Sequence, residues 1–214
     1  MPYGTMLQVI KHPLIDHYLT RIRDIDTSCA RFRDLVGCVG TLLAYEATRD
    51  VKQEEVEVQT PMEKCTGLRF ANNVCIVPIL RAGIGFSDAI VSLFPDAHIG
   101  HIGLFRNEDI LEPVEYYKSL PIQIGQGPVL LVDPMLATGG SAIAAAKMLK
   151  EKGCKDIRFI CLIAAPEGIE KFHIAHPDVP IYTAAVDRQL DENGYILPGL
   201  GDAGDRIFGT LEKH

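Results

Sequence analysis

The amino-acid sequence predicts an α/β fold in which a central parallel sheet is flanked by helices. Three short apolar runs, at 74–80, 129–132 and 157–165, have the length and composition of strands buried on both faces. Stretches with apolar residues at helical spacing lie between and around these runs. Strands that alternate with helices favour a parallel sheet joined by right-handed crossovers. With 214 residues, 47% of them hydrophobic, the chain can bury the core of one domain.

The N-terminal quarter is expected to be helical. Residues 31–48 place apolar side chains three and four positions apart, which predicts an amphipathic helix. A shorter helix is expected from about residue 12 to Arg23, and Asp26-Thr27-Ser28 provides a break and an N-cap before the longer helix. Residues 51–65 alternate in part between apolar and polar residues, so we expect a strand followed by a linker.

The run at 74–80 is expected to lead into a turn made by Arg81-Ala82-Gly83. A helix should follow from Ile84 to Phe94, where Pro95 ends it. An arginine at the carboxyl end of a parallel strand lies where α/β folds bind ligands. Arg81 is therefore a candidate for binding an anion, and a structural arginine, solvated or paired with an acid, is the alternative.

Residues 99–121 contain two β-like pieces separated by a charged stretch, which predicts a mobile hairpin. The charged stretch holds Arg106, Asn107, Glu108 and Asp109. From the residues alone, Arg106 is either a solvated loop charge or a ligand for an anion.

The segment 128–153, PVLLVDPMLATGGSAIAAAKMLKEKG, carries the strongest chemical signal. Its strand ends at Asp133, and its helix begins after Ala137-Thr138-Gly139-Gly140-Ser141 and ends near Gly153. The two glycines let backbone N–H groups converge at the helix start beside two hydroxyls, an arrangement that binds phosphate. Asp133 would bind a second group in the same pocket, such as a sugar diol or a magnesium ion. The alternative is an ordinary glycine-rich turn with a capping serine.

The C-terminal segment 195–206, YILPGLGDAGDR, satisfies the pattern GxGxxG at 199–204. It is not a dinucleotide fingerprint, because the ten residues after Gly204 are too few for a crossover helix, a second strand and a ribose-binding acid. Closely spaced small residues do let a backbone approach a flat ligand and present N–H and C=O groups to its edge. The alternative is a plain surface turn.

Charge and composition exclude several classes of protein. The net charge of −7 argues against a nucleic-acid partner, since such surfaces depend on clustered Lys and Arg. There is no apolar run of about 20 residues and no signal peptide, so we expect a cytoplasmic protein without a membrane partner. The six cysteines show no CxxC spacing and are expected to be reduced. Two HxxH pairs have no third ligand at a diagnostic spacing, so a zinc site is not expected.

Several of these segments resemble one enzyme family. VLLVDPMLATGGS resembles the 5-phosphoribosyl 1-pyrophosphate (PRPP) motif of type I phosphoribosyltransferases, in the form seen in uracil phosphoribosyltransferases. YILPGLGDAGDRIFGT resembles the uracil-binding motif of that family, and HPLI, FRDL and LLAYEATRD resemble its N-terminal part. Pro134 stands where most of the superfamily has a second acid, which separates the chain from purine and orotate enzymes. The resemblance runs from about His12 to the end of the chain.

The resemblance implies a type I phosphoribosyltransferase fold with a β-hairpin arm and a small hood formed by the N- and C-terminal segments. It implies a single domain over 1–214, with a core at about 71–190 and a hood from about 1–70 and 190–214. The implied reaction transfers the phosphoribosyl group of PRPP to uracil, giving UMP and pyrophosphate in pyrimidine salvage. Mg²⁺ is the implied cofactor and is held mainly by the substrate, so no side chain is assigned as its direct ligand. The hairpin arm makes subunit contacts in this family, which implies a homodimer or a larger homo-oligomer. GTP activates some relatives, which leaves a GTP effector open.

The resemblance also implies roles for particular residues. Asp133, Arg106 and Asp202 are implied to be catalytic. The residues implied to bind PRPP are Arg81, Arg106, Asp133, Pro134, Met135, Leu136, Ala137, Thr138, Gly139, Gly140, Ser141 and Asp202. Those implied to contact uracil are Ile196, Gly201, Asp202 and Ala203. A cis peptide bond is implied in the loop formed by Leu80-Arg81-Ala82-Gly83.

Two alternatives stay open. One is an enzyme of the same fold that acts on a purine or on orotate, which the Asp133-Pro134 pair and the C-terminal loop disfavour. The other is a non-enzymatic regulator that retains the fold and senses nucleotides or binds RNA. The set of Arg81, Asp133 and Asp202 and the acidic net charge disfavour this second reading.

Overall fold

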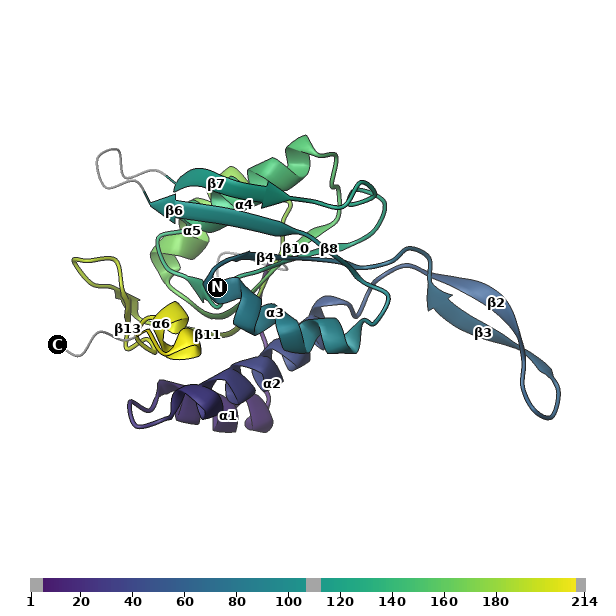
Figure 1. Cartoon of the computed structure of the whole chain (residues 1–214), viewed down its shortest axis with the longest axis horizontal. Coiled ribbons are helices and arrows are strands. Elements are labelled where there is room, and N and C mark those ends of the chain that lie inside the picture. The colour runs from purple at the N-terminus through teal and green to yellow at the C-terminus, as the bar shows by residue number, and fades with distance from the viewer. Residues whose placement is uncertain (1–5, 107–112, 211–214) are drawn as a thin grey trace.

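A computed structural model of the chain describes residues 6–106 and 113–210 (Figure 1). Its main sheet is parallel except at one edge, where the last two strands form an antiparallel pair. In spatial order the strands are β1 (Leu7–Val9), β11 (Ile181–Val186), β10 (Ile157–Ala164), β8 (Val129–Val132), β4 (Cys75–Leu80), β6 (His101–Arg106) and β7 (Pro113–Ser119). The short strands β5 (His98–Ile99) and β9 (Met135–Leu136) pair with β4 and β10. The expected α/β class and central parallel sheet are confirmed.

Helices cover both faces of the sheet, which explains why its central strands are almost entirely buried and, apart from Arg158 of β10, apolar. Alternate residues of β8 point to opposite faces of the sheet and enter two different cores. Leu130 and Val132 belong to the first core, and Val129 and Leu131 belong to the second. The first core includes residues of α1 (Pro13–Arg23), α2 (Cys29–Ala47), α3 (Ala82–Leu93) and α6 (Ala203–Phe208). The second includes residues of α4 (Gly140–Glu151) and α5 (Pro166–Ala175). Figure 1 shows the two groups of helices on opposite sides of the sheet.

The strongly periodic elements lie close to where the sequence places them. The helix expected at 31–48 is α2, and its N-cap is Ser28, whose hydroxyl accepts a hydrogen bond from the Arg31 N–H at 3.4 Å. The helix after the glycine-rich run begins at Gly140, behind Gly139 with a φ of +85°. The two β-like pieces of 99–121 are β6 and β7. The charged residues expected at 107–109 lie outside the described part of the chain.

The strand expected within 51–65 is confirmed, but the linker expected after it is wrong, because a turn and a second strand follow. Strands β2 (Gln53–Gln59) and β3 (Lys64–Phe70) form an antiparallel hairpin that projects from the body of the molecule (Figure 1). All but one residue in each strand is exposed, so no buried face imposes the alternation that would reveal the second strand. The turn is closed by the Thr60 hydroxyl, which accepts hydrogen bonds from the Met62 and Glu63 N–H groups, and it lacks the Asn-Gly signal of a short hairpin.

Part of the C-terminal loop is helical, since residues Ala203–Phe208 form the short helix α6. The carboxylate of Asp202 caps this helix by accepting a hydrogen bond from the Asp205 N–H at 2.8 Å. In the ranges 6–106 and 113–210, no helix combines the length and hydrophobicity needed to cross a bilayer.

Candidate active site

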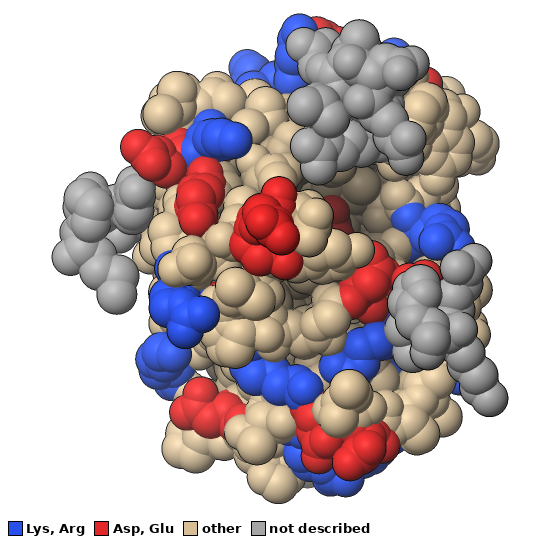
Figure 2. All heavy atoms as spheres, turned by 90° about the vertical axis from the view of Figure 1, so that its left-hand side faces the viewer, with Lys and Arg blue, Asp and Glu red and all other residues tan. Residues whose placement is uncertain are grey.

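A cleft of about 350 Å³ lies at the carboxyl ends of β4 and β8, the edge at which parallel sheets bind ligands. It joins the glycine-rich segment after β8 to the C-terminal loop, two parts of the chain that are distant in sequence. Figure 2 shows this end of the molecule, with acidic and basic side chains around a hollow. The lining residues are Arg81, Ala82, Asp133, Met135, Ala137, Gly194, Tyr195, Asp202, Ala203 and Gly204.

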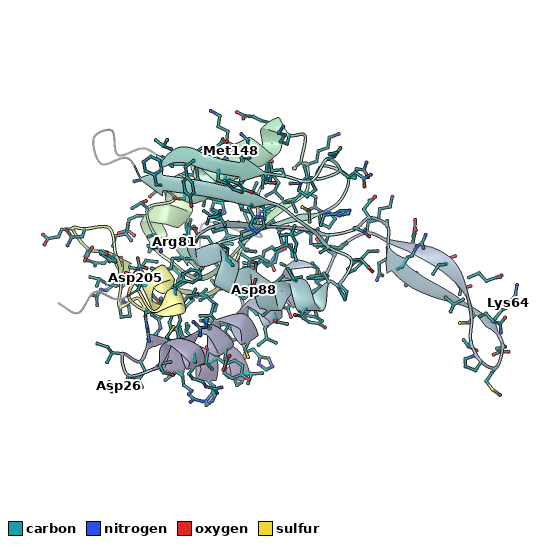
Figure 3. All side chains as sticks on the ribbon, in the orientation of Figure 1. Asp26, Lys64, Arg81, Asp88, Met148 and Asp205 are labelled. Carbon is teal, nitrogen blue, oxygen red and sulfur yellow. The ribbon has the colours of Figure 1, made fainter. Side chains whose placement is uncertain are left out.

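Arg81 stands between the end of β4 and the start of α3, exposed to the cleft (Figure 3). The peptide bond between Leu80 and Arg81 is cis, as the resemblance implies. Two residues later, Gly83 lets the start of α3 lie directly on the sheet, because a Cβ there would be 2.8 Å from the carbonyl oxygen of Val132. The Arg81 guanidinium therefore lies in the same cleft as Asp133, which directly follows Val132 in the chain.

The loop after β8 is anchored by residues that do not line the cleft. The carbonyl of Pro134 accepts from the Leu162 N–H, and the carbonyl of Leu136 accepts from the Ala165 N–H, each at 2.9 Å. Pro134 and Leu136 are buried, and their alternation with Met135 and Ala137 turns the latter two toward the cleft. Thr138, Gly139, Gly140 and Ser141 continue from Ala137 into the first turn of α4.

Asp133 is partly buried, and its position changes its acidity. Burial among protein atoms raises the pKa of its carboxyl from 3.8 to about 7, because the charged form loses hydration. A hydrogen bond from the Met135 backbone opposes this rise, and the charge of Asp202 adds to it. The two carboxylates are thus near enough to interact, and Asp133 takes up protons near neutral pH.

The C-terminal loop contributes three consecutive residues to the cleft. Asp202 and Ala203 line the cleft, whereas Gly201 lies beside it, with a φ of +79°. The Ile196 side chain is only 3% exposed and belongs to the core shared with α2, so it does not reach the cleft. One oxygen of Asp202 is already used to cap α6.

Arg106 is the last residue of β6 and its backbone pairs with Pro113 of β7. Its side chain lies outside the described part of the structure, so its expected role is not tested by the geometry.

Sequence reasoning missed the hairpin formed by β12 (Gln189–Leu190) and β13 (Ile196–Leu197). Its tip carries Gly194 and Tyr195, which line the cleft. A Cβ on Gly194 would be 3.4 Å from the Thr138 methyl carbon, so this tip touches the glycine-rich segment. The Asn193-Gly194 pair is a turn signal that could have revealed the hairpin.

A larger cavity, of about 470 Å³, lies at the base of the β2–β3 hairpin. Its lining includes Glu54, Arg69 and Phe70 but none of the residues singled out for chemistry. The smaller cleft is the better candidate active site, because it alone of these two joins an anchored glycine-rich loop, an arginine and two carboxylates.

Comparison with known proteins identifies the family. A family model described as uracil phosphoribosyltransferase matches residues 9–210. The chain belongs to the uracil phosphoribosyltransferase family. A uracil phosphoribosyltransferase of Staphylococcus aureus (strain Newman) is 56% identical over 205 residues, which cover 95% of this chain and 98% of that protein.

Two solved structures share the fold of this chain. The AQ2163 protein of Aquifex aeolicus superposes with a TM-score of 0.92 at 36% identity, over 97% of this chain and all of that one. A hypoxanthine-guanine phosphoribosyltransferase of Bacillus anthracis superposes with a TM-score of 0.52 at 12% identity, over 74% of this chain and 82% of that one. The second likeness shows the type I phosphoribosyltransferase fold and nothing finer.

Proposed function

We propose that the cleft transfers the 5-phosphoribosyl group of PRPP to uracil, giving UMP and pyrophosphate. The chain is a phosphoribosyltransferase by family, and the 56% identical relative bears the name of this activity. The observation that carries the proposal is that one cavity is lined both by Asp133, Met135 and Ala137 and by Asp202, Ala203 and Gly204. A phosphate site and a base site have to share a cavity for the transfer to occur. The same membership argues against a purine or orotate enzyme and against a non-enzymatic regulator.

The 5′-phosphate is assigned to the segment from Ala137 to Ser141. The first N–H groups of α4 have no partner within the helix, and Gly139 brings the chain into the helix with a left-handed turn. Each interaction of an anion with an exposed helix end is worth only about 0.3–1 kcal/mol, so several N–H and hydroxyl donors must act together. Thr138 and Ser141 supply the hydroxyls.

The remaining charged groups are assigned to the ribose and the pyrophosphate. Asp133 would accept hydrogen bonds from the ribose hydroxyls, and Arg81 would pair with pyrophosphate oxygens. Arg106, carried by the β6–β7 hairpin, would neutralise the rest of the negative charge on the leaving pyrophosphate. Departure of pyrophosphate leaves positive charge on the ribose, which the carboxylates of Asp133 and Asp202 stabilise. A hairpin that closes over this centre would also exclude water.

Mg²⁺ fits the residues that line the cleft. Mg²⁺ commonly binds through one or two carboxylates together with substrate phosphates and water, and Asp133 and Asp202 supply that number of carboxylates. Within the described residues, no group of three or more His, Cys, Asp or Glu could form a metal site by itself. When bound with PRPP, the metal would neutralise charge on the leaving group.

Uracil is assigned to the backbone of Gly201, Asp202 and Ala203. The edge of the base presents two acceptors, O2 and O4, around one N–H donor. A rigid loop that offers donor, acceptor and donor would leave groups unpaired with cytosine, and this selects against it. Ile196 as a whole is only 3% exposed and does not line the cleft, so its contact with uracil rests on the family resemblance alone.

The assembly and location of the protein belong to the same proposal. We propose a homodimer or larger homo-oligomer, supported by Phe105, Tyr116 and Tyr117 of the β6–β7 arm, which are 48%, 52% and 49% exposed. We also propose a cytoplasmic location, where the substrates of nucleotide salvage occur, and GTP as an effector, as the family resemblance suggests.

Conversion of labelled uracil to UMP tests the proposed function. The wild-type protein should require both PRPP and Mg²⁺, and cytosine, hypoxanthine and orotate should be poor substrates. Asp133→Asn should lower turnover by about 10² or more while the protein stays folded, because the carboxylate that stabilises the transition state is lost. Asp88→Asn, which changes an exposed carboxylate of α3 outside the cleft, is the matched control (Figure 3). Unchanged turnover in Asp133→Asn would contradict the role, and no UMP from the wild-type protein would contradict the function.

A further inference from the structure

Gly199 is held at both of its peptide groups by one ion pair. Its carbonyl accepts a hydrogen bond from Arg23 Nη1 at 2.6 Å, and its N–H donates to Asp187 Oδ2 at 2.9 Å. Arg23 and Asp187 are joined by two further hydrogen bonds, of 2.8 and 2.5 Å. The side chains of Arg23 and Asp187 are 25% and 4% exposed, so the pair is largely shielded from water.

Both charged residues have fixed supports. Arg23 is the last residue of α1, which packs on α2. Asp187 directly follows β11, and its own N–H donates to the Ala164 carbonyl of β10 at 2.8 Å. The ion pair therefore connects the backbone of Gly199 to the main sheet on one side and to the N-terminal helices on the other.

The position of Gly199 makes this connection relevant to the base. Gly199 lies two residues before Gly201 and has a φ of +67°, and a Cβ there would be 2.1 Å from the Ile196 carbonyl oxygen. The next carbonyl, that of Leu200, accepts from Arg206 Nη1 at 2.7 Å. Side chains that do not line the cleft thus hold the backbone of residues 199 and 200 by hydrogen bonds. Residues 202–204, which follow shortly after, line the cleft.

An ion pair that served stability alone would not need hydrogen bonds to the backbone of Gly199, yet both of these side chains form one. Buried ion pairs are weak evidence for stability, because the loss of hydration offsets much of the attraction. Here the two charges hold an N–H and a carbonyl of one residue, and so determine both the position and the orientation of the peptide groups around it. Backbone groups that recognise a base need such control, since an error of about 1 Å can reduce a rate 10²-fold.

We infer that Arg23 and Asp187 are positioning residues for base recognition, and that they set the selectivity of the cleft for uracil over cytosine through the backbone of 199–203. The inference rests on the proposed function. It gives α1, which contributes no residue to the cleft lining, a part in the choice of substrate.

Arg23→Lys and Asp187→Asn test this inference. Each should raise the KM for uracil roughly tenfold and lower the uracil-to-cytosine ratio of kcat/KM, while the KM for PRPP changes less than about twofold. The double variant should be no worse than the worse single variant, because the two residues act as one unit. Arg21→Lys, at an exposed arginine of the same helix, and Asp88→Asn are the matched controls and should leave both KM values unchanged.

Other outcomes overturn the inference. Unchanged selectivity, or an equal rise of both KM values that follows the loss in melting temperature, would make the pair purely structural. If either variant fails to fold, Arg23→Ala assayed with millimolar methylguanidinium decides: recovery of the KM for uracil supports the inference and no recovery overturns it. A wild-type protein that converts no uracil would instead remove the proposed function, and with it the premise.

Discussion

Asp133 shows at the scale of one residue how a site can oppose the stability of its fold. Its carboxyl is held where burial raises the pKa to about 7, although an aspartate in water has a pKa of 3.8. A bound metal ion and the positive charge that develops on the ribose would favour the ionised form of this carboxylate, but the free protein does not. The residue is therefore placed for binding and catalysis rather than for folding.

The pH dependence of stability follows from the sign of this shift. Between about pH 4 and pH 7 the folded protein keeps a proton on Asp133 that the unfolded chain releases, so this residue makes the protein less stable as the pH rises. Asp133→Asn removes the ionisation. It should therefore raise the free energy of unfolding near pH 8, by an amount on the order of a few kcal/mol at about 1.4 kcal/mol per pKa unit, and change it little near pH 4.

Denaturant unfolding of the wild-type and Asp133→Asn proteins at the two pH values measures this difference. Asp88→Asn on the outer surface of α3 should show no such gain. A gain in Asp133→Asn that is the same at both pH values would show that the buried charge is not its cause.

At the scale of elements, the glycine-rich segment depends on a helix that follows it in the chain. A Cβ on Gly168, in the first turn of α5, would be 2.2 Å from the carbonyl oxygen of Ala137 and 2.9 Å from that of Leu136. Helix α5 can pack against this loop only because residue 168 has no side chain. Gly168 contributes nothing to the cleft lining, yet it supports the position of Ala137 within it.

Gly168→Ala should displace the loop at Ala137 and weaken the use of PRPP. We expect the KM for PRPP to rise about tenfold or more, because several phosphate contacts depend on that backbone, whereas Glu170→Ala, at an exposed position of the same helix, should leave it unchanged. Steady-state kinetics with each substrate varied in turn gives the comparison. A normal KM for PRPP in Gly168→Ala would show that the loop adapts without loss.

The sequence predicts those elements whose surroundings impose a pattern. Helix α2 repeats its apolar residues against the first core. Strand β8 is apolar, and so is β10 apart from Arg158, because helices cover both faces of these strands. The β2–β3 hairpin has no buried face, and β9 and α6 are too short to show a period. These elements depend on hydrogen bonds and neighbours that no local pattern reveals.

The same distinction applies to the candidate site. The glycine-rich and C-terminal segments were predicted because the chemistry is contiguous in sequence, and the structure brings Asp133, Ala137 and Asp202 into one cleft. Gly168 and the Arg23–Asp187 pair act through contacts between residues distant in the chain. Nothing near Arg23 in the sequence indicates that its partner lies 164 residues away.

At the scale of the whole molecule, the two cores share the sheet and the two ends of the chain hold each other. Arg206 of α6 donates hydrogen bonds to the carbonyls of Ile22 and Asp24, each at 2.6 Å. Its guanidinium carbon also lies 4.3 Å from the centre of the Phe32 ring, within the range of a cation–π interaction. The N- and C-terminal segments of the proposed hood are thus joined by hydrogen bonds between residues more than 180 positions apart. Helix α2 of the hood packs directly on β10 and β11.

We therefore expect residues 1–214 to unfold as one domain. Calorimetry at constant protein concentration should give a single transition, because loss of the hood would expose the apolar face of the sheet and the core beneath α2. Arg206→Lys should lower the melting temperature, since a lysine cannot make the three carbonyl contacts in one plane, but the transition should stay single. The control is Arg49→Lys, because Arg49 forms an exposed ion pair with Glu46 at the end of α2. This variant should have the melting temperature of the wild type. Two resolved transitions in the wild-type protein, with residues 6–70 melting apart from the sheet, would show instead that the hood folds independently and that the base loop it supports can open without unfolding the phosphate site.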